Sequence, residues 1–363
     1  MISAQSRHSY WLGVAAFLAV ALAGLSWTQS ASAQIRLGFV AGPHATSTSL
    51  DAIKASGATH VREKFSWAES EPRKGVMDWT AMDADLAGAS RAGIPLVAVL
   101  SNTPSWAIEP GTPRGHQDTY PSRIANFTAW AGRVAKRYGP GGDFWTSHPD
   151  LTPTPLRTWQ VWNEPNVASA WTGGAASPER YAALLTQTRD AIRATDRTAT
   201  IQAAGMASGG YGSAAPDAFL KAVWRNLGPV RSALYQWDVH AYSDTVAHAA
   251  AVIPWMRNLM DASGCRGCKL VVGEFGWASG TASAQRYGWL CAGSAARQAQ
   301  MGHDFLAVVL RSAAANRLVE LSWYRWDDPA PNSGATGCFQ SLGVVSYLGV
   351  PKPSLAYFER FAK

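Results

Sequence analysis

The feature that most constrains the fold is a regular alternation of short apolar runs, rich in β-branched and aromatic residues, with longer amphipathic segments. The short runs predict eight strands, at 35–40, 59–65, 95–101, 157–163, 199–205, 235–242, 269–275 and 319–326. The amphipathic segments predict helices at 48–57, 79–92, 122–138, 177–194, 215–226, 245–263, 294–316 and 354–362. Ser177 followed by Pro178 is typical of a helix start, and Gly93, Gly139 and Gly264 stand where helices should end.

Eight strand–helix units predict an α/β protein that folds as one closed (β/α)8 TIM barrel over residues 34–363. An open, doubly wound sheet is the rival arrangement. That fold favours a G-x-G-x-x-G turn after its first strand, and "GFVAGPHATS" does not match it. No low-complexity linker divides the chain, so we expect a single domain.

The first 33 residues have the pattern of a secretory signal peptide. Arg7 precedes the apolar run "WLGVAAFLAVALAGLSW", and Ala31-Ser32-Ala33 offers a cleavage site. An uncleaved membrane anchor is the alternative, but the run is slightly short for a span. We therefore expect a secreted or periplasmic protein with no membrane span after cleavage.

Four cysteines in an exported chain suggest two disulfides. Three pairings are possible. We favour Cys265 with Cys268, which needs only a short local loop, and Cys291 with Cys338. A zinc role for Cys-Arg-Gly-Cys is disfavoured because no second C-x-x-C completes such a site, so we expect neither a metal nor a cofactor.

The net charge and the tryptophan content indicate which kinds of molecule the protein could bind. The formal net charge is +7, but the basic residues are scattered singly, which argues against a nucleic-acid partner. Solvated helix faces explain them, and an acidic polymer as substrate is the alternative. The 17 tryptophans could hold flat, amphipathic ligands or could pack in the core. We expect a monomer.

Polar residues gather where the predicted strands end, which is where barrels of this type carry their chemistry. Strand 2 ends near Arg62, strand 4 at Asn163 and Glu164, and strand 7 at Glu274. Strand 6 ends at His240 and Tyr242, and strand 8 at Trp323 to Trp326. Two carboxylates, an arginine, a tyrosine and indoles at one barrel mouth are the groups needed to cleave a glycosidic bond.

The motifs "WNEPN" and "GEFGW" resemble those of the clan of retaining glycosidases whose acid/base and nucleophile lie on strands 4 and 7. "VREKFSWAESEPRKGVMDWTAMDADL", "PLVAVLSNTPSWA" and "WYRWDDPA…LGVVSYLGVPKPSLAYF" are similar to glycoside hydrolase family 39, whereas "GEFG" is closer to family 5. The resemblance runs from about residue 36 to the C-terminus. Family 39 β-xylosidases usually append a β-sandwich for which this sequence has no room, so their exo-acting specificity is in doubt here.

The resemblance implies that Glu164 is the general acid/base and Glu274 the nucleophile of a retaining reaction. A nucleophile must be ionised, and we expect Arg62 and Tyr242 to keep Glu274 in its charged form. Asn163 is expected to bond the sugar 2-hydroxyl. Strict alternation would send Asn163 and Glu164 to opposite faces, so the chain must twist or bulge there, which Pro165 favours.

Other residues are candidates for binding the substrate. Of Trp323 and Trp326, which have opposite parity, the family resemblance favours Trp323 as the floor of the reacting-sugar subsite, with Trp326 packing outside or lining the rim. His240 either positions the ligand or is a satisfied histidine of the barrel interior. Trp106, Trp171 and Trp277 could line outer subsites, with core packing as the alternative for each. Asn102 and His44 are further candidates in mouth loops. Glu69 and Glu71 are expected in an exposed loop.

The expected function is an exported retaining glycoside hydrolase acting on β-glycosidic bonds of a poly- or oligosaccharide. The mouth segments 103–121, 139–155 and 327–341 could either wall off a pocket or flank a groove. We expect an open groove and endo action because no accessory domain is available to cap the mouth. The alternatives are an exo-acting β-xylosidase or β-glucosidase, a transglycosidase, and a non-catalytic glycan-binding barrel.

Overall fold

The computed structural model describes residues 35–42, 44–111, 119–168, 176–207, 215–228, 234–281 and 288–363. All of them belong to one compact unit, Ala33–Lys363. The expected signal peptide, residues 1–33, and Trp171 lie outside the described residues.

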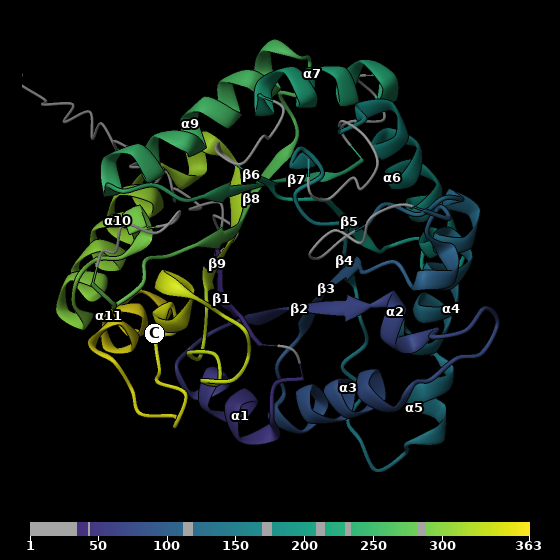
Figure 1. Ribbon diagram of the computed structural model, residues 1–363, viewed down its shortest axis with the longest axis horizontal. Coiled ribbons are helices and arrows are strands. Elements are labelled where there is room, and N and C mark those ends of the chain that lie inside the picture. Colours follow the sequence, from purple (N-terminus) through teal and green to yellow (C-terminus); the bar gives the residue numbers. More distant parts are fainter. Residues whose placement is uncertain are drawn as a thin grey trace, which may run out of the picture. The chain divides into compact units, whose positions relative to one another are not determined.

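The strands form one closed parallel barrel of eight positions, which confirms the predicted fold (Figure 1). The first four strands are β1 (Arg36–Val40), β2 (His60–Ser66), β3 (Leu96–Ser101) and β4 (Thr158–Val161). The fifth position is divided between β5 (Thr200–Ala203) and β6 (Met206–Ala207). The remaining strands are β7 (Gln236–Ala241), β8 (Lys269–Phe275) and β9 (Leu318–Tyr324), and β9 pairs with β1 to close the ring.

Each predicted helix is present and lies outside the strands (Figure 1). Their bounds are α1 Ser47–Ala55, α3 Thr80–Ala92, α4 Ile124–Tyr138, α6 Pro178–Arg193, α7 Pro216–Leu227, α9 Val246–Ala262, α10 Ala295–Asn316 and α11 Pro353–Ala362. Short elements that the periodicity did not indicate are α2 (Trp67–Ser70), α5 (Asp143–Ser147), η1 (Ser105–Ala107), η3 (Gly288–Leu290) and η4 (Gly337–Ser341). The hydroxyl of Ser177 caps α6 as expected, and Gly93 ends α3 in the left-handed conformation.

The core divides into an aromatic outer layer and a polar interior. Between sheet and helices, seven tryptophans are almost fully buried: Trp67, Trp130, Trp159, Trp162, Trp237, Trp277 and Trp323. Inside the barrel, buried polar side chains bond one another across strands that are not neighbours; for example, Gln202 on β5 donates to Glu320 on β9. Much of the tryptophan content therefore serves packing, and the barrel interior is lined by ionisable groups.

Both expected disulfides are present, Cys265–Cys268 and Cys291–Cys338. The second joins the segment after β8 to the segment after β9. Its Cys338 belongs to a small apolar cluster with Ala278, Leu290 and Leu342, against which Tyr242 and Tyr324 pack. Within the described ranges, none of the helices combines the length and apolar character that crossing a membrane requires.

Candidate active site

Arg62 organises the polar groups at the C-terminal ends of the strands. Its Nη1 donates to Glu274 Oε1 at 2.8 Å, its Nη2 to Asn163 Oδ1 at 3.0 Å, and its Nε to Gln160 Oε1 at 2.8 Å. The side chain is only 4% exposed. One guanidinium therefore holds groups from β4, the turn after β4, and β8 in fixed relative positions.

The turn after β4 brings two successive side chains to the same mouth. β4 ends at Val161, and both Trp162 (φ 75°) and Glu164 (φ 44°) have positive φ. These left-handed residues break the strand alternation, as the sequence required, so that Trp162 is buried while Asn163 and Glu164 are half-buried at the mouth. Conformations of this kind are costly for non-glycine residues and gather at functional sites.

Asn166, which was not among the predicted site residues, anchors this turn. It is fully buried, its Nδ2 donates to Ala207 O at 2.9 Å, and its Oδ1 accepts from Ala207 N at 3.0 Å. Glu164 N also donates to Gly205 O at 3.0 Å. The second asparagine of "NEPN" thus ties the turn to β6.

The two glutamates meet at one imidazole nitrogen. His240 Nδ1 lies 2.7 Å from Glu164 Oε1 and 3.6 Å from Glu274 Oε2. The His240 side chain is fully buried, whereas Glu164 is 31% and Glu274 12% exposed. Two carboxylates 110 positions apart in the sequence therefore face a shared point at the barrel mouth.

Glu274 is held in its charged form. Burial by itself raises the pKa of this carboxyl, but the positive charges of His240 and Arg62 and the hydrogen bonds from Tyr242 and Arg62 outweigh it and leave the pKa below its usual value. Tyr242 Oη donates to Glu274 Oε2 at 2.9 Å. Burial and the neighbouring Glu274 carboxylate raise the pKa of Tyr242 well above its ordinary value, so the phenol remains a donor.

Asp238 lies beneath His240 in the barrel interior. Its carboxylate accepts from Gln160 Nε2 and from Gly273 N, and it lies 3.8 Å from His240 Nε2. Burial raises the pKa of Asp238 to about 6, against the opposing effect of His240 and Arg62. The pKa of His240 is itself raised: its burial opposes charging, but Glu274, Glu164 and Asp238 favour it more strongly. Ionisable side chains, His240 and Asp238, therefore lie directly beneath the carboxylates of Glu164 and Glu274.

The structure corrects the assignment of the aromatic floor. Trp323 is fully buried outside the barrel, where its ring packs on Phe275 and against Gly302 of α10. Trp326 is 4% exposed and packs edge-on against Phe39, with ring centroids 5.1 Å apart. Neither indole is placed to hold a sugar in the mouth, because each fills space between sheet and helices.

Tyr324, which was not among the predicted site residues, is the half-buried aromatic residue at the end of β9. Its ring lies 6.4 Å from that of Tyr242 in an edge-to-face arrangement. Burial and the charge of Glu274 raise its pKa. Parity along β9 could have identified it, since Glu320 and Ser322, four and two positions earlier, both bond inside the barrel.

The remaining candidates are spread over several environments. Trp277 is fully buried and donates from Nε1 to Ser243 O at 2.8 Å, so it does not line an open subsite. Trp106, half-buried in η1, donates to Glu71 O at 2.8 Å. Asn102, with φ 64°, donates from Nδ2 to Ser66 Oγ at 3.4 Å just after β3.

The expectation for Glu71 was wrong. Its side chain is buried rather than solvated, because it accepts from Trp67 Nε1 at 2.8 Å and pairs with Arg133 at 2.6 Å. Glu69, in contrast, is half exposed, at the surface of α2.

Neither a protein-family model nor a curated protein sequence matches the chain. Solved structures are similar in fold. A family 39 glycoside hydrolase from the gut symbiont Bacteroides cellulosilyticus WH2 aligns with a TM-score of 0.65 and 18% identity over 91% of this chain and 64% of that one. A GH5_18 protein from Bifidobacterium longum subsp. infantis gives 0.63 and 16%, over 90% and 78%. A monomeric β-xylosidase from Caulobacter crescentus CB15 gives 0.64 and 16%, over 90% and 67%.

The chain thus spans less than two thirds of the first of these structures. At such identities the likeness establishes the fold. It is the fold that the sequence resemblance to families 39 and 5 implied, a (β/α)8 barrel.

Proposed function

We propose that the protein is an exported retaining glycoside hydrolase that cleaves β-glycosidic bonds in a poly- or oligosaccharide by double displacement. The observation that carries the proposal is the pair Glu164 and Glu274 meeting at His240 Nδ1, with Glu274 bound by Arg62 and Tyr242. Glu274 is fixed and charged, as the nucleophile of such a reaction must be, and Glu164 is the more exposed of the two.

The spacing of the carboxylates favours the retaining course. Because His240 Nδ1 lies 2.7 Å from Glu164 Oε1 and 3.6 Å from Glu274 Oε2, those oxygens can be no further apart than the sum of the two distances. That limit is about 6.3 Å for this pair of oxygens, just below the roughly 6.5–9.5 Å between the carboxyl groups of inverting enzymes; retaining enzymes keep theirs about 5–5.5 Å apart.

The reaction would proceed in two steps. Glu274 attacks the anomeric carbon while Glu164 gives its proton to the glycosidic oxygen, so the bond to the leaving group breaks as the bond to Glu274 forms. Water then gives a proton to Glu164 and its oxygen to the anomeric carbon, and Glu274 is released. Asn163, whose Oδ1 is occupied by Arg62, would present its Nδ2 to the sugar 2-hydroxyl.

Export is supported by the two disulfides, which persist in oxidising compartments. We retain the signal peptide, residues 1–33, as part of the proposal. Endo action on a polysaccharide also remains a proposal; the similarity to a structure named as a β-xylosidase makes exo action its main alternative.

The test is a screen of aryl β-glycosides and β-linked polysaccharides with the wild type and Glu274→Ala. We expect the variant to lose turnover and azide to restore part of it, with an α-glycosyl azide as product, because azide occupies the space left by the carboxylate. Glu179→Ala, an exposed glutamate at the start of α6, should leave turnover unchanged.

Product analysis by mass spectrometry separates the alternatives. Internal cleavage products support endo action, release of single sugars supports exo action, and products longer than the substrate indicate a transglycosidase. Full activity of Glu274→Ala would overturn the assignment of the nucleophile. Calorimetric binding without any bond cleavage would instead establish a glycan-binding barrel.

A further inference from the structure

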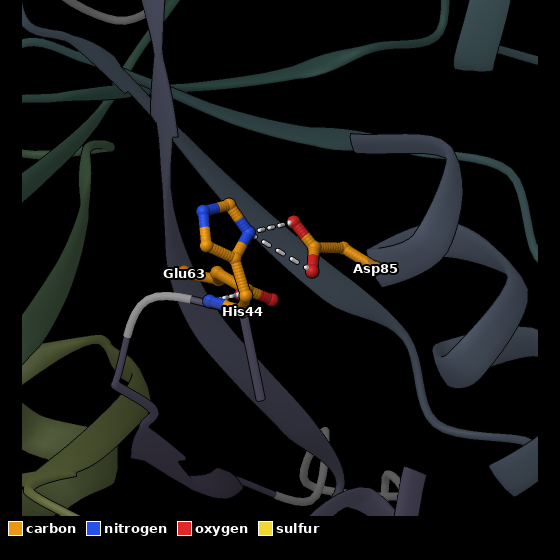
Figure 2. Close-up of side chains that lie close together, drawn as sticks. All are labelled: His44, Glu63 and Asp85. Atoms are coloured by element: carbon orange, nitrogen blue, oxygen red, sulfur yellow. Dashed lines mark hydrogen bonds and ion pairs between the residues drawn. The ribbon is translucent and has the colours of Figure 1, made fainter. Parts of the chain in front are cut away.

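A second group of ionisable side chains lies on the outer side of β2, away from the two carboxylates of the mouth. It consists of His44 in the segment after β1, Glu63 on β2 and Asp85 on α3 (Figure 2). Arg62, the preceding residue of β2, points into the barrel, so alternation turns Glu63 outward. One potential ligand atom from each of the three residues lies within 4.8 Å of the others.

The contact between His44 and Asp85 has the spacing of two ligands of one ion. His44 Nδ1 lies 3.2 Å from Asp85 Oδ2 and 3.4 Å from Oδ1 (Figure 2). A charge-assisted hydrogen bond would usually be shorter, about 2.7–2.9 Å. Tetrahedral Zn²⁺ with bonds of about 2.0–2.1 Å keeps its ligand atoms about 3.3 Å apart.

The charge of the group is unbalanced. Glu63 and Asp85 are 2% and 4% exposed. Over the described ranges, no lysine or arginine forms an ion pair with either carboxylate. Glu63 accepts a hydrogen bond from His44 N at 3.1 Å, and among the described side chains only His44 forms a hydrogen bond or ion pair with Asp85. Burying two adjacent carboxylates is costly unless a cation or a proton compensates them.

Glu69 supplies a further element of a metal site. Its Oε1 lies 3.0 Å from His44 Nε2, the ring nitrogen opposite to the one that faces Asp85. Metal-bound histidines usually donate their other N–H to a carboxylate, which fixes the tautomer and the ring orientation. Glu69, on the surface of α2, has the position of that outer partner.

We propose that His44, Glu63 and Asp85 bind one divalent transition-metal ion of the Zn²⁺ class, with Glu69 orienting His44. One imidazole and two carboxylates suit zinc and its neighbours, whereas Ca²⁺ prefers an all-oxygen set. Three protein ligands leave a position for water. The ion would join the segment after β1, β2 and α3, and would be separate from the proposed catalytic residues.

The experiment is a titration of the full chain with Zn²⁺ after chelation, read by calorimetry and by metal content. Any affinity tag is removed first, and both disulfides are kept intact. We expect about one ion per chain and a higher melting temperature in its presence. His44→Ala, whose side chain is 43% exposed, and Asp85→Asn should each weaken binding at least tenfold, and Glu69→Gln about tenfold.

His248→Ala is the matched control. His248 Nδ1 also lies 3.2 Å from an aspartate, Asp244, but both side chains are exposed and lack a buried carboxylate beside them. This variant should bind Zn²⁺ as the wild type does. The proposal would be overturned if the wild type did not bind Zn²⁺, or if both His44→Ala and Asp85→Asn kept the wild-type affinity. It would also be overturned if His248→Ala lost affinity equally, or if Ca²⁺ bound more tightly than Zn²⁺. A proton shared between the buried carboxylates would then account for their burial.

Discussion

Arg62 and Glu274 are joined by a 2.8 Å hydrogen bond that links β2 to β8 at the mouth of the barrel. Together with burial, His240 and the hydrogen bond from Tyr242, this contact sets the pKa of the carboxylate, which lies below its usual value. The interaction stabilises the fold above the ordinary glutamate pKa and is lost as the pH falls through the lowered native pKa. Activity that needs ionised Glu274 should have the same acid limit.

Arg62→Gln removes one of the charges that lower the pKa of Glu274. The acidic limb of kcat/KM should therefore move to higher pH, and activity at the optimum should fall about 10²–10³-fold because Asn163 and Glu274 lose their common donor. The pH–rate profile is the measurement. Arg225→Met, an exposed arginine of α7, is the control, and an unshifted acidic limb in Arg62→Gln would contradict the role of this charge.

Glu164→Ala separates the two steps of the proposed reaction. Substrates with poor leaving groups need a proton on the departing oxygen and should lose about 10²–10⁴-fold in kcat/KM. Dinitrophenyl glycosides need no such proton, so their glycosylation step should be nearly unchanged and the covalent intermediate should accumulate. A burst of dinitrophenol measures this directly. Equal losses for both kinds of substrate would show that Glu164 is not the acid.

Tyr324 and Trp323 should respond to substitution in opposite ways. Tyr324→Ala is expected to raise KM and lower kcat with a small change in melting temperature, because the ring is half-buried at the mouth beside Tyr242. Trp323→Ala should lower the free energy of unfolding by about 3–5 kcal/mol, because it empties a fully buried site between β9 and α10. Steady-state kinetics and denaturant unfolding of both variants test the contrast.

The two disulfides should contribute unequally to stability. Cys291–Cys338 closes 47 positions of chain and Cys265–Cys268 only 3. Loop-closure entropy then predicts a loss of about 4 kcal/mol for the double alanine variant of the first and about 2 kcal/mol for that of the second. Melting temperatures of the two double variants provide the comparison. Since Tyr242 and Tyr324 pack on the cluster that contains Cys338, the first variant should also raise KM.

Periodicity predicted every barrel strand and its helix, because the spacing of apolar residues along a segment depends on its secondary structure and not on the details of how it packs. The strand ends also predicted that Glu164 and Glu274 would share a mouth, since parallel strands end on the same side. The choice among aromatic residues failed at β9. There the family resemblance favoured Trp323, whereas strand alternation turns this side chain outward, where Gly302 of α10 leaves space for its ring.

The turn at Glu164 shows a second limit of sequence reasoning. Alternation indicated that the strand must be interrupted, but the positive φ values of Trp162 and Glu164 arise from tertiary bonds, such as those of Asn166 to Ala207. Glu71 is a similar case: its sequence neighbourhood is typical of an exposed loop, and its burial depends on Trp67 and on Arg133 of a distant helix.

The polar interior of the barrel has an evolutionary consequence. Arg62 donates to Gln160, Gln160 donates to Asp238, and Asp238 also accepts from the backbone of Gly273. Replacing one member of this series leaves the neighbouring polar atoms buried without a hydrogen-bond partner. In descendants of this sequence, substitutions in this hydrogen-bonded series are therefore accepted only as compensating pairs. Residues on the solvent-exposed face of the helices can be substituted one at a time.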